Sequence, residues 1–584
     1  MRQPHDHGLL NLRYAQALVD GLCAAGLRDL VLSPGSRSSP LALAFLRQPA
    51  IASQVIVDER SAAFFALGIA KARRRPVAVL ATSGSAVANW LPAVVEADLG
   101  AVPLLLLSAD RPPELVGWGA NQTIDQQRLF GVHLRACHAP GPPAPDFATG
   151  YLHSLAARAL SDCRSPLPGP VQLNLAFREP LLPTATELAG VTAGAAGPRD
   201  GQPAPRTGCP RLLPERQLVA DSGAAISGRP GVIVCAGDDY PPGFADAVSA
   251  LARQLDCPLL AEPLSNLRFG GHDRSRICVH YDAFLRPPAE LAAARPDWLL
   301  RCGGFPVTRT LQDWLNANGT ALHIVLGAGG RWRDPLHCAG AVIQGDPLAA
   351  CEDWLAMPLQ PAPPDWRETF ARAERRVAAL AAIWRSRDDF EGALIPALLD
   401  ELPAGHRVFC GNSLPIRDLD AFSGSGDKVL HFFGNRGVSG IDGNLSTALG
   451  IASTGPCVAL VGDLTVQHDL TALAAAGGRD IVVVVINNGG GGIFEYLPVA
   501  TLPEFERAWL TPQAVDLVGA ALAFGVAGER CAALGDFTSA LRRALQRGGA
   551  TLLEVAIDRR RSVEQHRAFW QHAAAVAGSG PAMP

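Results

Sequence analysis

Several features that would place the chain in other classes of protein are missing from its sequence. Basic residues do not exceed acidic ones, with 51 Lys and Arg against 55 Asp and Glu, whereas a protein that coats nucleic acid needs a basic excess. The longest apolar runs, such as 102–108 and 481–486, are far shorter than the roughly 20 residues of a membrane span. Residues 1–8 lack the basic stretch and apolar core of a secretory signal. We therefore expect a cytoplasmic protein with no nucleic-acid or membrane partner.

The cysteines lack the spacing of a zinc site or of a disulfide framework. The chain has 13 of them, scattered along its length, with no CxxC pair and no Cys/His cluster at zinc-ligand spacing. We interpret them as reduced thiols, many of them packed as small apolar side chains.

The composition that is present is that of a folded globular protein. Hydrophobic residues make up 48% and charged residues 18% of 584 positions, a length that suggests about three domains. Short apolar runs alternate with amphipathic stretches, which is typical of parallel sheets covered by helices on both faces. Pro-rich stretches near 181–214 and 357–364 separate three segments. The sequence thus predicts an α/β protein with three doubly wound, mostly parallel-sheet domains, and the first and last could share one architecture.

The predicted strands give each segment its own sheet. They lie at 29–33, 54–57, 77–81, 103–108 and 171–174, the last closing the first sheet; at 231–236, 258–261, 298–301, 322–326 and 341–344; and at 407–410, 429–433, 456–461, 481–486 and 551–557. The middle sheet resembles a dinucleotide-binding one, but its first loop is Ala236-Gly237-Asp238-Asp239 instead of GxGxxG. We therefore expect no NAD or FAD there.

The strongest local signal for chemistry lies in the last segment. One strand leads into Gly462-Asp463-Leu464, and the next leads into Asn487-Asn488-Gly489-Gly490, with Asn488 following Asp463 by 25 residues. A helix over 468–477 fits between them, and both parallel strands would end at the sheet edge where ligands bind. The Asp463 carboxylate, the Asn488 amide oxygen and the Gly490 carbonyl are ligands suited to a hard cation such as Mg²⁺, which binds protein oxygens and phosphate oxygens together. The alternative is that Asp463 and Asn488 only cap helices.

This spacing resembles the thiamin-diphosphate motif, in which Gly-Asp-Gly is followed at a similar distance by Asn-Asn, although Leu464 replaces the second glycine. Such enzymes need a carboxylate from another domain to activate the cofactor's aminopyrimidine. Glu59 meets that need at the start of an Ala-rich helix over 60–72, in a run that resembles the pyrimidine-binding domain of thiamin enzymes. Alone, Glu59 could equally be a favourable charge at a helix N-terminus.

Six further stretches resemble a single thiamin-enzyme family. They are 33–38, 108–115, 119–124, 411–418, 435–443 and 491–498, and all are similar to the 2-succinyl-5-enolpyruvyl-6-hydroxy-3-cyclohexene-1-carboxylate synthases of menaquinone biosynthesis, which also carry the Leu464 variant. The resemblance implies the thiamin-diphosphate-binding fold, with a pyrimidine domain at 1–182, a linker at 183–213, a central domain at 214–358, a linker and helix at 359–384, and a diphosphate domain at 385–577. It also implies Mg²⁺ or Mn²⁺, and a homodimer or homotetramer with active sites between subunits.

The resemblance further implies a reaction and the residues that serve it. Thiamin diphosphate decarboxylates 2-oxoglutarate, and the succinyl-semialdehyde carbanion adds in a conjugate manner to isochorismate. Each substrate carries two carboxylates, which guanidinium groups bind in a bidentate fork. Ser413, Arg417 and Arg436 would hold 2-oxoglutarate and, with Glu59, form the catalytic set. The isochorismate set would be Ser36, Arg37, Arg111, Asn121, Gln122 and Arg309, the last in place of a family lysine. Residues around the cofactor and pocket would be Glu59, Ile441, Gly462, Asp463, Leu464, Asn488, Ile493, Phe494 and Leu497, with Asp463, Asn488 and Gly490 on the metal.

Two alternatives remain at this point. One is a different thiamin lyase, such as an acetohydroxyacid synthase or a benzoylformate-type decarboxylase, whose smaller or aromatic substrates do not need several arginines. The other is a non-catalytic nucleotide- or CoA-binding protein that uses the middle sheet. The second predicts no thiamin binding and has no use for Glu59.

Overall fold

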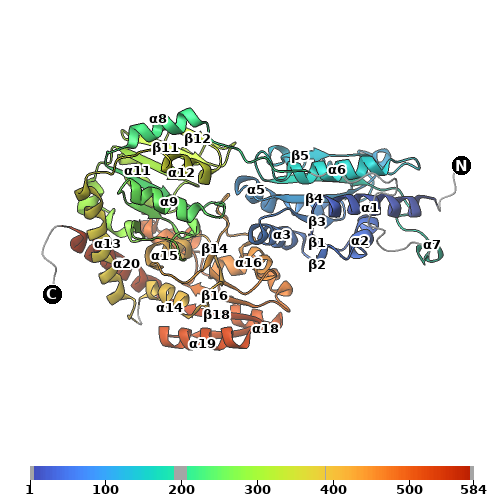
Figure 1. Cartoon of the computed structure of the whole chain (residues 1–584). Coiled ribbons are helices and arrows are strands. Elements are labelled where there is room, and N and C mark those ends of the chain that lie inside the picture. Colours follow the sequence, from blue (N-terminus) through green and yellow to red (C-terminus); the bar gives the residue numbers. More distant parts are fainter. Residues whose placement is uncertain (1–5, 190–204, 206, 388–389, 579–584) are drawn as a thin grey trace. The chain divides into compact units, whose positions relative to one another are not determined.

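The computed structural model describes residues 6–189, 205, 207–387 and 390–578. Three six-stranded sheets, each parallel throughout, organise this part of the chain (Figure 1), which confirms the predicted α/β class. Each of the predicted ranges 1–182, 214–358 and 385–577 contains one sheet, while the boundaries between domains stay a prediction. Within the described residues, no helix combines the length and the apolar character that crossing a bilayer requires.

The chain divides into two compact units that do not follow the order of the sequence. Unit 1 comprises Met1–Pro210, Asn435–Thr454 and His468–Arg479, and unit 2 comprises Arg211–Gly434, Gly455–Gln467 and Asp480–Pro584. Two stretches of the last segment therefore belong with the first sheet. They contain helix α16 (Asn444–Ala452) and the 3₁₀ helix η6 (Leu470–Ala475).

Unit 1 is built on a sheet of strand order β2-β1-β3-β4-β6-β5. The strands are β1 (Asp29–Leu32), β2 (Ala52–Val55), β3 (Val77–Ala81), β4 (Leu104–Asp110), β5 (Ala136–His138) and β6 (Pro170–Ala176). The four central strands are buried along their whole length, which explains why they read as continuous apolar runs. The prediction that 171–174 closes the sheet is wrong, because the short strand β5 pairs with the outer side of β6.

Helices cover both faces of this sheet. Helices α1 (Asp6–Ala24), α2 (Ser39–Leu46) and α6 (Thr149–Asp162) share one apolar core with the strands. Helices α3 (Glu59–Arg73) and α5 (Leu91–Leu99) pack together on the sheet, and α16 packs against α3. The short helices α4 (Ser85–Ala88) and α7 (Ala185–Ala189) complete the unit. Part of the predicted linker 183–213, namely 190–204 and 206, lies outside the described residues.

Helices α3 and α16 approach each other at two glycines. A Cβ atom on Gly68 would lie 2.1 Å from the Thr447 carbonyl oxygen, and one on Gly450 would lie 2.1 Å from the Phe65 carbonyl oxygen. Contacts this short force one backbone away from the other. The glycines thus hold the 444–452 stretch against the helix that begins with Glu59.

We expect Gly68→Ala to lower the free energy of unfolding of the protein by about 1–3 kcal/mol, since overpacking outweighs the gain in helix propensity. The measurement is the thermal midpoint by calorimetry. Gly150→Ala is the matched control, because Gly150 is also helical and a Cβ there would meet no atom within 4 Å. A Gly68→Ala protein as stable as the control would contradict the close packing of α3 and α16.

The central sheet of unit 2 has the order β12-β11-β10-β7-β8-β9. Its strands are β7 (Gly231–Cys235), β8 (Leu259–Ala261), β9 (Ile277–Cys278), β10 (Trp298–Cys302), β11 (Leu322–Gly327) and β12 (Ala339–Gln344). This is the order 3-2-1-4-5-6 of dinucleotide-binding sheets, as its sequence resemblance suggested. Around it lie α8 (Arg216–Ile226), α9 (Phe244–Gln254), α10 (Tyr281–Phe284), α11 (Arg309–Ala317) and α12 (Pro347–Leu355).

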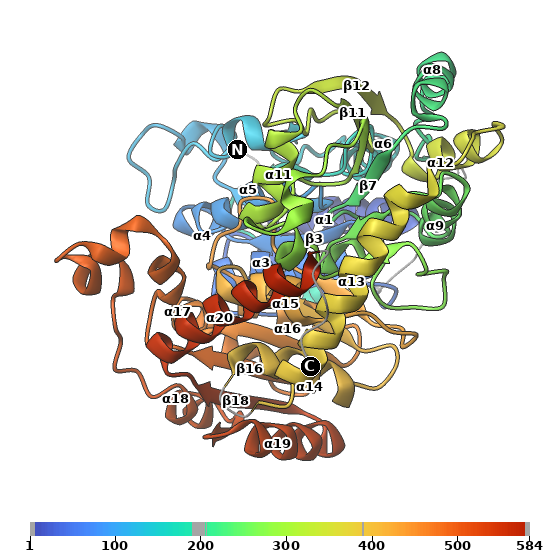
Figure 2. The ribbon, with the colours of Figure 1, turned by 90° about the vertical axis from the view of Figure 1, so that its left-hand side faces the viewer.

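The last sheet, of order β14-β13-β15-β16-β18-β17, repeats the strand order of the first, which confirms the expectation of a shared architecture. Its strands are β13 (Arg407–Cys410), β14 (His431–Phe433), β15 (Cys457–Gly462), β16 (Ile481–Asn487), β17 (Ala527–Cys531) and β18 (Ala550–Ala556). Its helices are α14 (Leu394–Glu401), α15 (Leu414–Phe422), α17 (Asp463–His468), α18 (Leu517–Ala523), α19 (Leu534–Arg547) and α20 (Arg559–Ala577). Helix α13 (Pro364–Trp384) lies beside α20 (Figure 2).

The prediction of one helix over 468–477 is wrong. The chain forms α17 immediately after β15 and then turns into η6, which belongs to unit 1. The turn is fixed by Asp469, whose buried carboxylate accepts hydrogen bonds from the Ser446 backbone N–H at 2.7 Å and from the Ser446 hydroxyl at 3.0 Å. A helix continued through Asp469 would lose these bonds. The sequence around Asp469 does not show them, because their donor Ser446 is 23 residues away.

Candidate cofactor and substrate site

The last sheet brings three predicted site segments to one edge. Strand β13 pairs with β15, and β15 pairs with β16, all in parallel, so that the residues after these strands lie at the same edge. Chain order changes direction between β13 and β15, and ligands of open α/β sheets bind at such switch points. Ser413 follows β13, Asp463 follows β15 and Asn488 follows β16.

Asp463 and Gly490 are in contact at this edge. Burial raises the pKa of Asp463 to about 6, and the nearby backbone N–H groups of Leu464 and Gly490 oppose the rise. The sequence prediction that the two strand ends meet is therefore confirmed for this pair.

Asn488 offers an oxygen that the protein leaves without a partner. Its Oδ1 atom is buried and has no hydrogen-bond partner among the described residues, a condition that normally costs free energy. A Cβ on Gly490, where φ is +131°, would lie 2.1 Å from the Leu510 carbonyl oxygen, and a Cβ on Gly492 would lie 2.5 Å from Asn488 Nδ2. The turn therefore requires glycine at positions 490 and 492. The oxygen atoms that Asp463, Asn488 and Gly490 offer suit a hard cation such as Mg²⁺.

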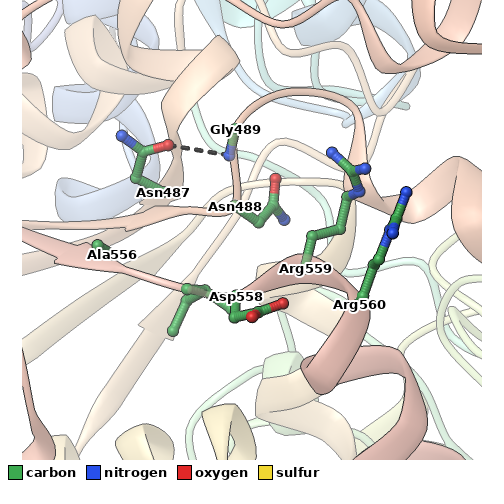
Figure 3. A pocket seen from close by; sticks show the side chains of 8 residues that line it. Asn487, Asn488, Gly489, Ala556, Asp558, Arg559 and Arg560 are labelled. Carbon is green, nitrogen blue, oxygen red and sulfur yellow. Dashed lines mark hydrogen bonds between the residues drawn. The ribbon is translucent and has the colours of Figure 1, made fainter.

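Asn487 and Glu554 shape the same turn, a role that the sequence did not indicate. Asn487 Oδ1 accepts a hydrogen bond from the Gly489 N–H at 3.0 Å (Figure 3). Asn487 Nδ2 donates to Glu554 Oε1 at 2.6 Å. Glu554 also pairs with Arg530 at 3.2 Å. Glu554, on strand β18, thus holds the loop that carries Asn488. The only sequence signal for this role is the Asn487-Asn488 pair, in which one asparagine holds the turn and the other offers its oxygen.

A cavity of about 450 Å³ opens beside this turn. Figure 3 shows that its lining comes from the ends of β16 and β18 and from the first turn of α20. The residues are Asn487, Asn488, Gly489, Ala556, Ile557, Asp558, Arg559 and Arg560. Two guanidinium groups and a helix N-terminus make this part of the edge favourable for negative charge.

Ser413 and Arg417 lie one turn apart at the start of α15. Ser413 has φ of +74°, unusual for a residue with a side chain, and such backbone conformations cluster at functional sites. Arg417 Nη1 donates to the Ser413 carbonyl oxygen at 2.6 Å. Both residues are only half-buried, so the guanidinium can meet a ligand at the sheet edge.

The apolar residues expected at the pocket lie in and after the 3₁₀ helix η7 (Gly492–Tyr496). Ile493 and Phe494 are half-buried, whereas Leu497 is 48% exposed. Glu495 pairs with Arg559 at 2.5 Å, which ties η7 to α20. The structure thus supports a fixed wall at Ile493 and Phe494.

In unit 1, Glu59 is the first residue of α3. Its neighbour Asp58 is the N-cap and accepts hydrogen bonds from the N–H groups of Arg60 at 2.9 Å and Ser61 at 3.2 Å. Asp58 also accepts from the Thr471 hydroxyl at 3.0 Å. Because Asp58 already caps the helix, the half-buried Glu59 carboxylate is not needed for that task.

Arg37 and Arg111 lie close together after β1 and β4. Arg37 is 6% exposed and donates to the Phe177 carbonyl oxygen at 2.9 Å and to Glu179 at 2.8 Å. Burial lowers the pKa of Arg111, and the positive charge of Arg37 lowers it further. Two neighbouring guanidinium groups of which only one has a carboxylate partner at this distance favour binding of an anion.

Ser83 joins two of the predicted isochorismate residues and was not singled out from the sequence. Its hydroxyl accepts a hydrogen bond from Arg111, and its carbonyl oxygen accepts from Gln122 Nε2 at 2.8 Å. Gln122 has φ of +58° and is exposed, as are Asn121 and Ser36.

Arg436 and Ile441 belong to unit 1, whereas strand β14, which precedes them in sequence, belongs to unit 2. The N–H groups of Gly437 and Val438 donate to the buried carboxylate of Glu96, on α5, at 2.9 and 2.8 Å. Both Arg436 and Ile441 are half-buried. The loop that carries them is therefore held against α5.

Arg309 differs from the other predicted arginines. It begins α11 on the central sheet, its side chain is 83% exposed, and it pairs with Asp313 at 2.8 Å. A substrate carboxylate would have to compete with Asp313 for this guanidinium, so the role of Arg309 stays a prediction.

Comparisons with known proteins agree with these observations. Residues 12–129 match the family described as "Thiamine pyrophosphate enzyme, N-terminal TPP binding domain", and residues 426–555 match its C-terminal TPP binding domain. A protein of Dechloromonas aromatica (strain RCB) named 2-succinyl-5-enolpyruvyl-6-hydroxy-3-cyclohexene-1-carboxylate synthase is 46% identical over 551 residues, covering 94% of this chain and 99% of that protein. The chain belongs to this synthase family.

Other relatives extend the comparison. A synthase of the same name from Geobacillus kaustophilus (strain HTA426) is 41% identical over 585 residues, covering 96% of this chain and 97% of that protein. The crystal structure of benzoylformate decarboxylase from Polynucleobacter necessarius superposes with a TM-score of 0.69 at 17% identity, covering 94% of this chain and 98% of that one, which shows a common fold. The synthase resemblance found in the sequence is thus confirmed, and the two thiamin-binding matches contain Glu59, Asp463 and Asn488.

Proposed function

We propose that the chain decarboxylates 2-oxoglutarate with thiamin diphosphate and adds the remaining four-carbon unit to isochorismate, as a synthase of menaquinone biosynthesis. The observation that carries this proposal is the similarity to synthases of that name over nearly the whole of both chains. The arginines held at the edges of the first and last sheets support substrates with several carboxylates.

Asp463, Asn488 and Gly490 would hold Mg²⁺ or Mn²⁺, because they offer carboxylate, amide and backbone oxygens and because Asn488 Oδ1 has no protein partner. Thiamin diphosphate, when bound there, would supply a carbon nucleophile for the 2-oxo acid. Gly462 and Leu464 line the same strand end, and Ile441, Ile493 and Phe494 would contact the cofactor. The Glu59 carboxyl would share a proton with the ring nitrogen of the aminopyrimidine.

Ser413, Arg417 and Arg436 would hold 2-oxoglutarate, with the guanidinium groups on its carboxylates. Arg37, Arg111 and Gln122, together with Ser36, Asn121 and Arg309, would hold isochorismate. The apolar wall of Phe494 and Leu497 would exclude water from the reacting carbon until the acceptor adds.

We expect Arg417→Lys to raise the KM for 2-oxoglutarate by about 10- to 100-fold, because a lysine cannot form the bidentate contact. Steady-state kinetics with each substrate varied in turn would measure this. Arg385→Lys is the control, since Arg385 pairs with an exposed carboxylate, that of Asp400. An unchanged KM for 2-oxoglutarate, or a rise only in the KM for isochorismate, would remove Arg417 from this role.

We also propose that the functional unit is a homodimer or a dimer of dimers, with Glu59 and Asp463 of one active site supplied by different subunits. Mixed dimers of Glu59→Gln and Asp463→Asn chains then contain one intact site. Two inactive variants unfolded and refolded together should regain roughly a quarter of wild-type activity, whereas each refolded alone should stay inactive. If both groups of a site come from one chain, the mixture stays inactive as well.

A cytoplasmic location is part of the proposal. None of the 13 cysteines, all of which lie in the described residues, is in a disulfide, and a reducing compartment favours this state.

The test of the proposed function is a panel of 2-oxo acids. The protein, supplied with thiamin diphosphate and Mg²⁺, is offered 2-oxoglutarate, pyruvate or benzoylformate, and CO₂ release is followed. Release from 2-oxoglutarate alone is expected. Release from pyruvate or benzoylformate instead would keep the cofactor site and make the protein a different thiamin lyase, and a failure to bind thiamin diphosphate would favour a non-catalytic binding protein.

A further inference from the structure

Three ionisable side chains that the proposed reaction does not use meet in the interior of unit 2. They are Glu391, before α14, Asp418, on α15, and His566, on α20. Each is at most 4% exposed, and one ligand atom from each lies within 4.8 Å of the others. Their sequence spacing matches no metal motif, so no local pattern predicts this cluster.

The hydrogen bonds of His566 define which of its ring nitrogens is available. Nδ1 lies 2.8 Å from the Ser562 carbonyl oxygen, and a carbonyl oxygen only accepts, so that Nδ1 carries the proton. Nε2 lies 3.4 Å from Asp418 Oδ1 but makes no hydrogen bond. Nε2 therefore faces the carboxylates and can bind a metal ion once it carries no proton, and an Nδ1–H bound to a backbone carbonyl is the usual arrangement of a metal-ligating histidine.

The two carboxylates are short of partners. Glu391 Oε2 accepts a hydrogen bond from the Ser562 hydroxyl, but Glu391 Oε1 and Asp418 Oδ2 have no partner within the described part of the chain. In the same residues, no lysine or arginine lies within ion-pair distance of either carboxylate. Burying two carboxylates in this way costs several kcal/mol unless a cation balances them.

We propose that Glu391, Asp418 and His566 bind a second divalent metal ion, distinct from the one expected at Asp463. Two carboxylates and a neutral imidazole balance a charge of +2. The imidazole favours a transition ion such as Zn²⁺ or Mn²⁺ over Mg²⁺ or Ca²⁺. Ser562 acts as the outer partner, since its hydroxyl orients Glu391 and its carbonyl oxygen orients His566.

The position of the site gives it a structural purpose. Asp418 directly follows Arg417 on α15, and α20, which carries His566, begins with Arg559, the partner of Glu495. Trp384, Phe390, Phe422 and Phe569 pack edge to face around the cluster and exclude water. A bound ion would hold α15 and α20 together behind the sheet edge that carries Ser413 and Arg417.

Without an ion, the same groups must share protons. Burial, reinforced by the negative charge of Asp418, raises the pKa of Glu391 to about 7. Burial lowers the pKa of His566, but Asp418 and Glu391 outweigh that effect and raise it to about 9. A protonated network of this kind is the rival, and it predicts no metal at the cluster.

The experiment uses Zn²⁺ as the probe. Full-length protein loaded with thiamin diphosphate and Mg²⁺ is exposed to Zn²⁺, dialysed against Mg²⁺ buffer and measured for zinc by mass spectrometry. One zinc per chain is expected in the wild type. Glu391→Gln and Asp418→Asn should lower zinc retention at least about 10-fold, while Asp463→Asn and Cys137→Ser, which removes an exposed thiol, should retain it.

Zinc retention equal in the wild type and in the cluster variants, or lost only with Asp463→Asn or Cys137→Ser, would overturn the proposal in favour of the shared-proton network. Should both cluster variants fail to fold, X-ray absorption of the zinc-loaded wild type decides. A shell of oxygens with one imidazole and no sulfur, retained in Asp463→Asn, is expected, and a sulfur shell or an absence of bound zinc would contradict the site.

Discussion

Replacement of Glu59 by glutamine is expected to lower turnover by about 10²- to 10⁴-fold, the usual contribution of a positioned acid–base group. The amide cannot share a proton with the cofactor's ring nitrogen as a carboxyl does. The cap of α3 is supplied by Asp58, so fold and cofactor binding should persist. The measurement is kcat at saturating substrates, together with the affinity for thiamin diphosphate and the thermal midpoint.

The control for Glu59 is Glu187→Gln, since Glu187 is, like Glu59, a half-buried first-turn glutamate, on α7 of the same unit. Its turnover should equal that of the wild type. If Glu59 serves only as a charge at a helix N-terminus, its glutamine variant would lose about 0.3–1 kcal/mol of stability and no turnover. That pattern would refute the role assigned here.

Replacement of Asp463 by asparagine is expected to weaken the binding of thiamin diphosphate at fixed Mg²⁺ by more than about 100-fold, because the metal loses its charged ligand. Turnover should fall with it. Calorimetric titration of the cofactor, with and without Mg²⁺, measures the effect. The two variants should therefore differ, since Glu59→Gln keeps the cofactor and Asp463→Asn loses it.

The matched control for Asp463 is Asp536→Asn, because Asp536 is an exposed aspartate in the first turn of α19 in the same unit. Its cofactor affinity should be that of the wild type. If Asp463 were only a helix cap, both variants would bind the cofactor equally well, and the metal site would have to lie elsewhere.

The parts of the fold that the sequence predicted best are the buried central strands. The ranges 77–81 and 407–410 coincide with β3 and β13, because strands buried on both faces are apolar throughout. The missed strands β5, β9 and β17 each lie at the edge of their sheet, where half-exposed residues leave no clear pattern. The helix predicted over 468–477 was wrong because this stretch packs in unit 1, which is a tertiary effect.

The site shows the same division between local and long-range information. Asp463, Asn488 and Gly490 were predicted because they follow neighbouring parallel strands. The links from Asn487 to Glu554 and from Glu391 to Ser562 and His566 join residues far apart in sequence. No local spacing encodes such contacts, and only the folded chain reveals them.

The most direct test of the proposed synthase reaction is the stoichiometry of its two half-reactions. The protein with thiamin diphosphate, Mg²⁺, 2-oxoglutarate and isochorismate is followed for CO₂ release and for loss of isochorismate in the same sample. The predicted result is equal amounts of both, with CO₂ release that nearly stops when isochorismate is omitted. CO₂ release that proceeds at the same rate without isochorismate, with no isochorismate consumed, would contradict the account and indicate a simple 2-oxo acid decarboxylase.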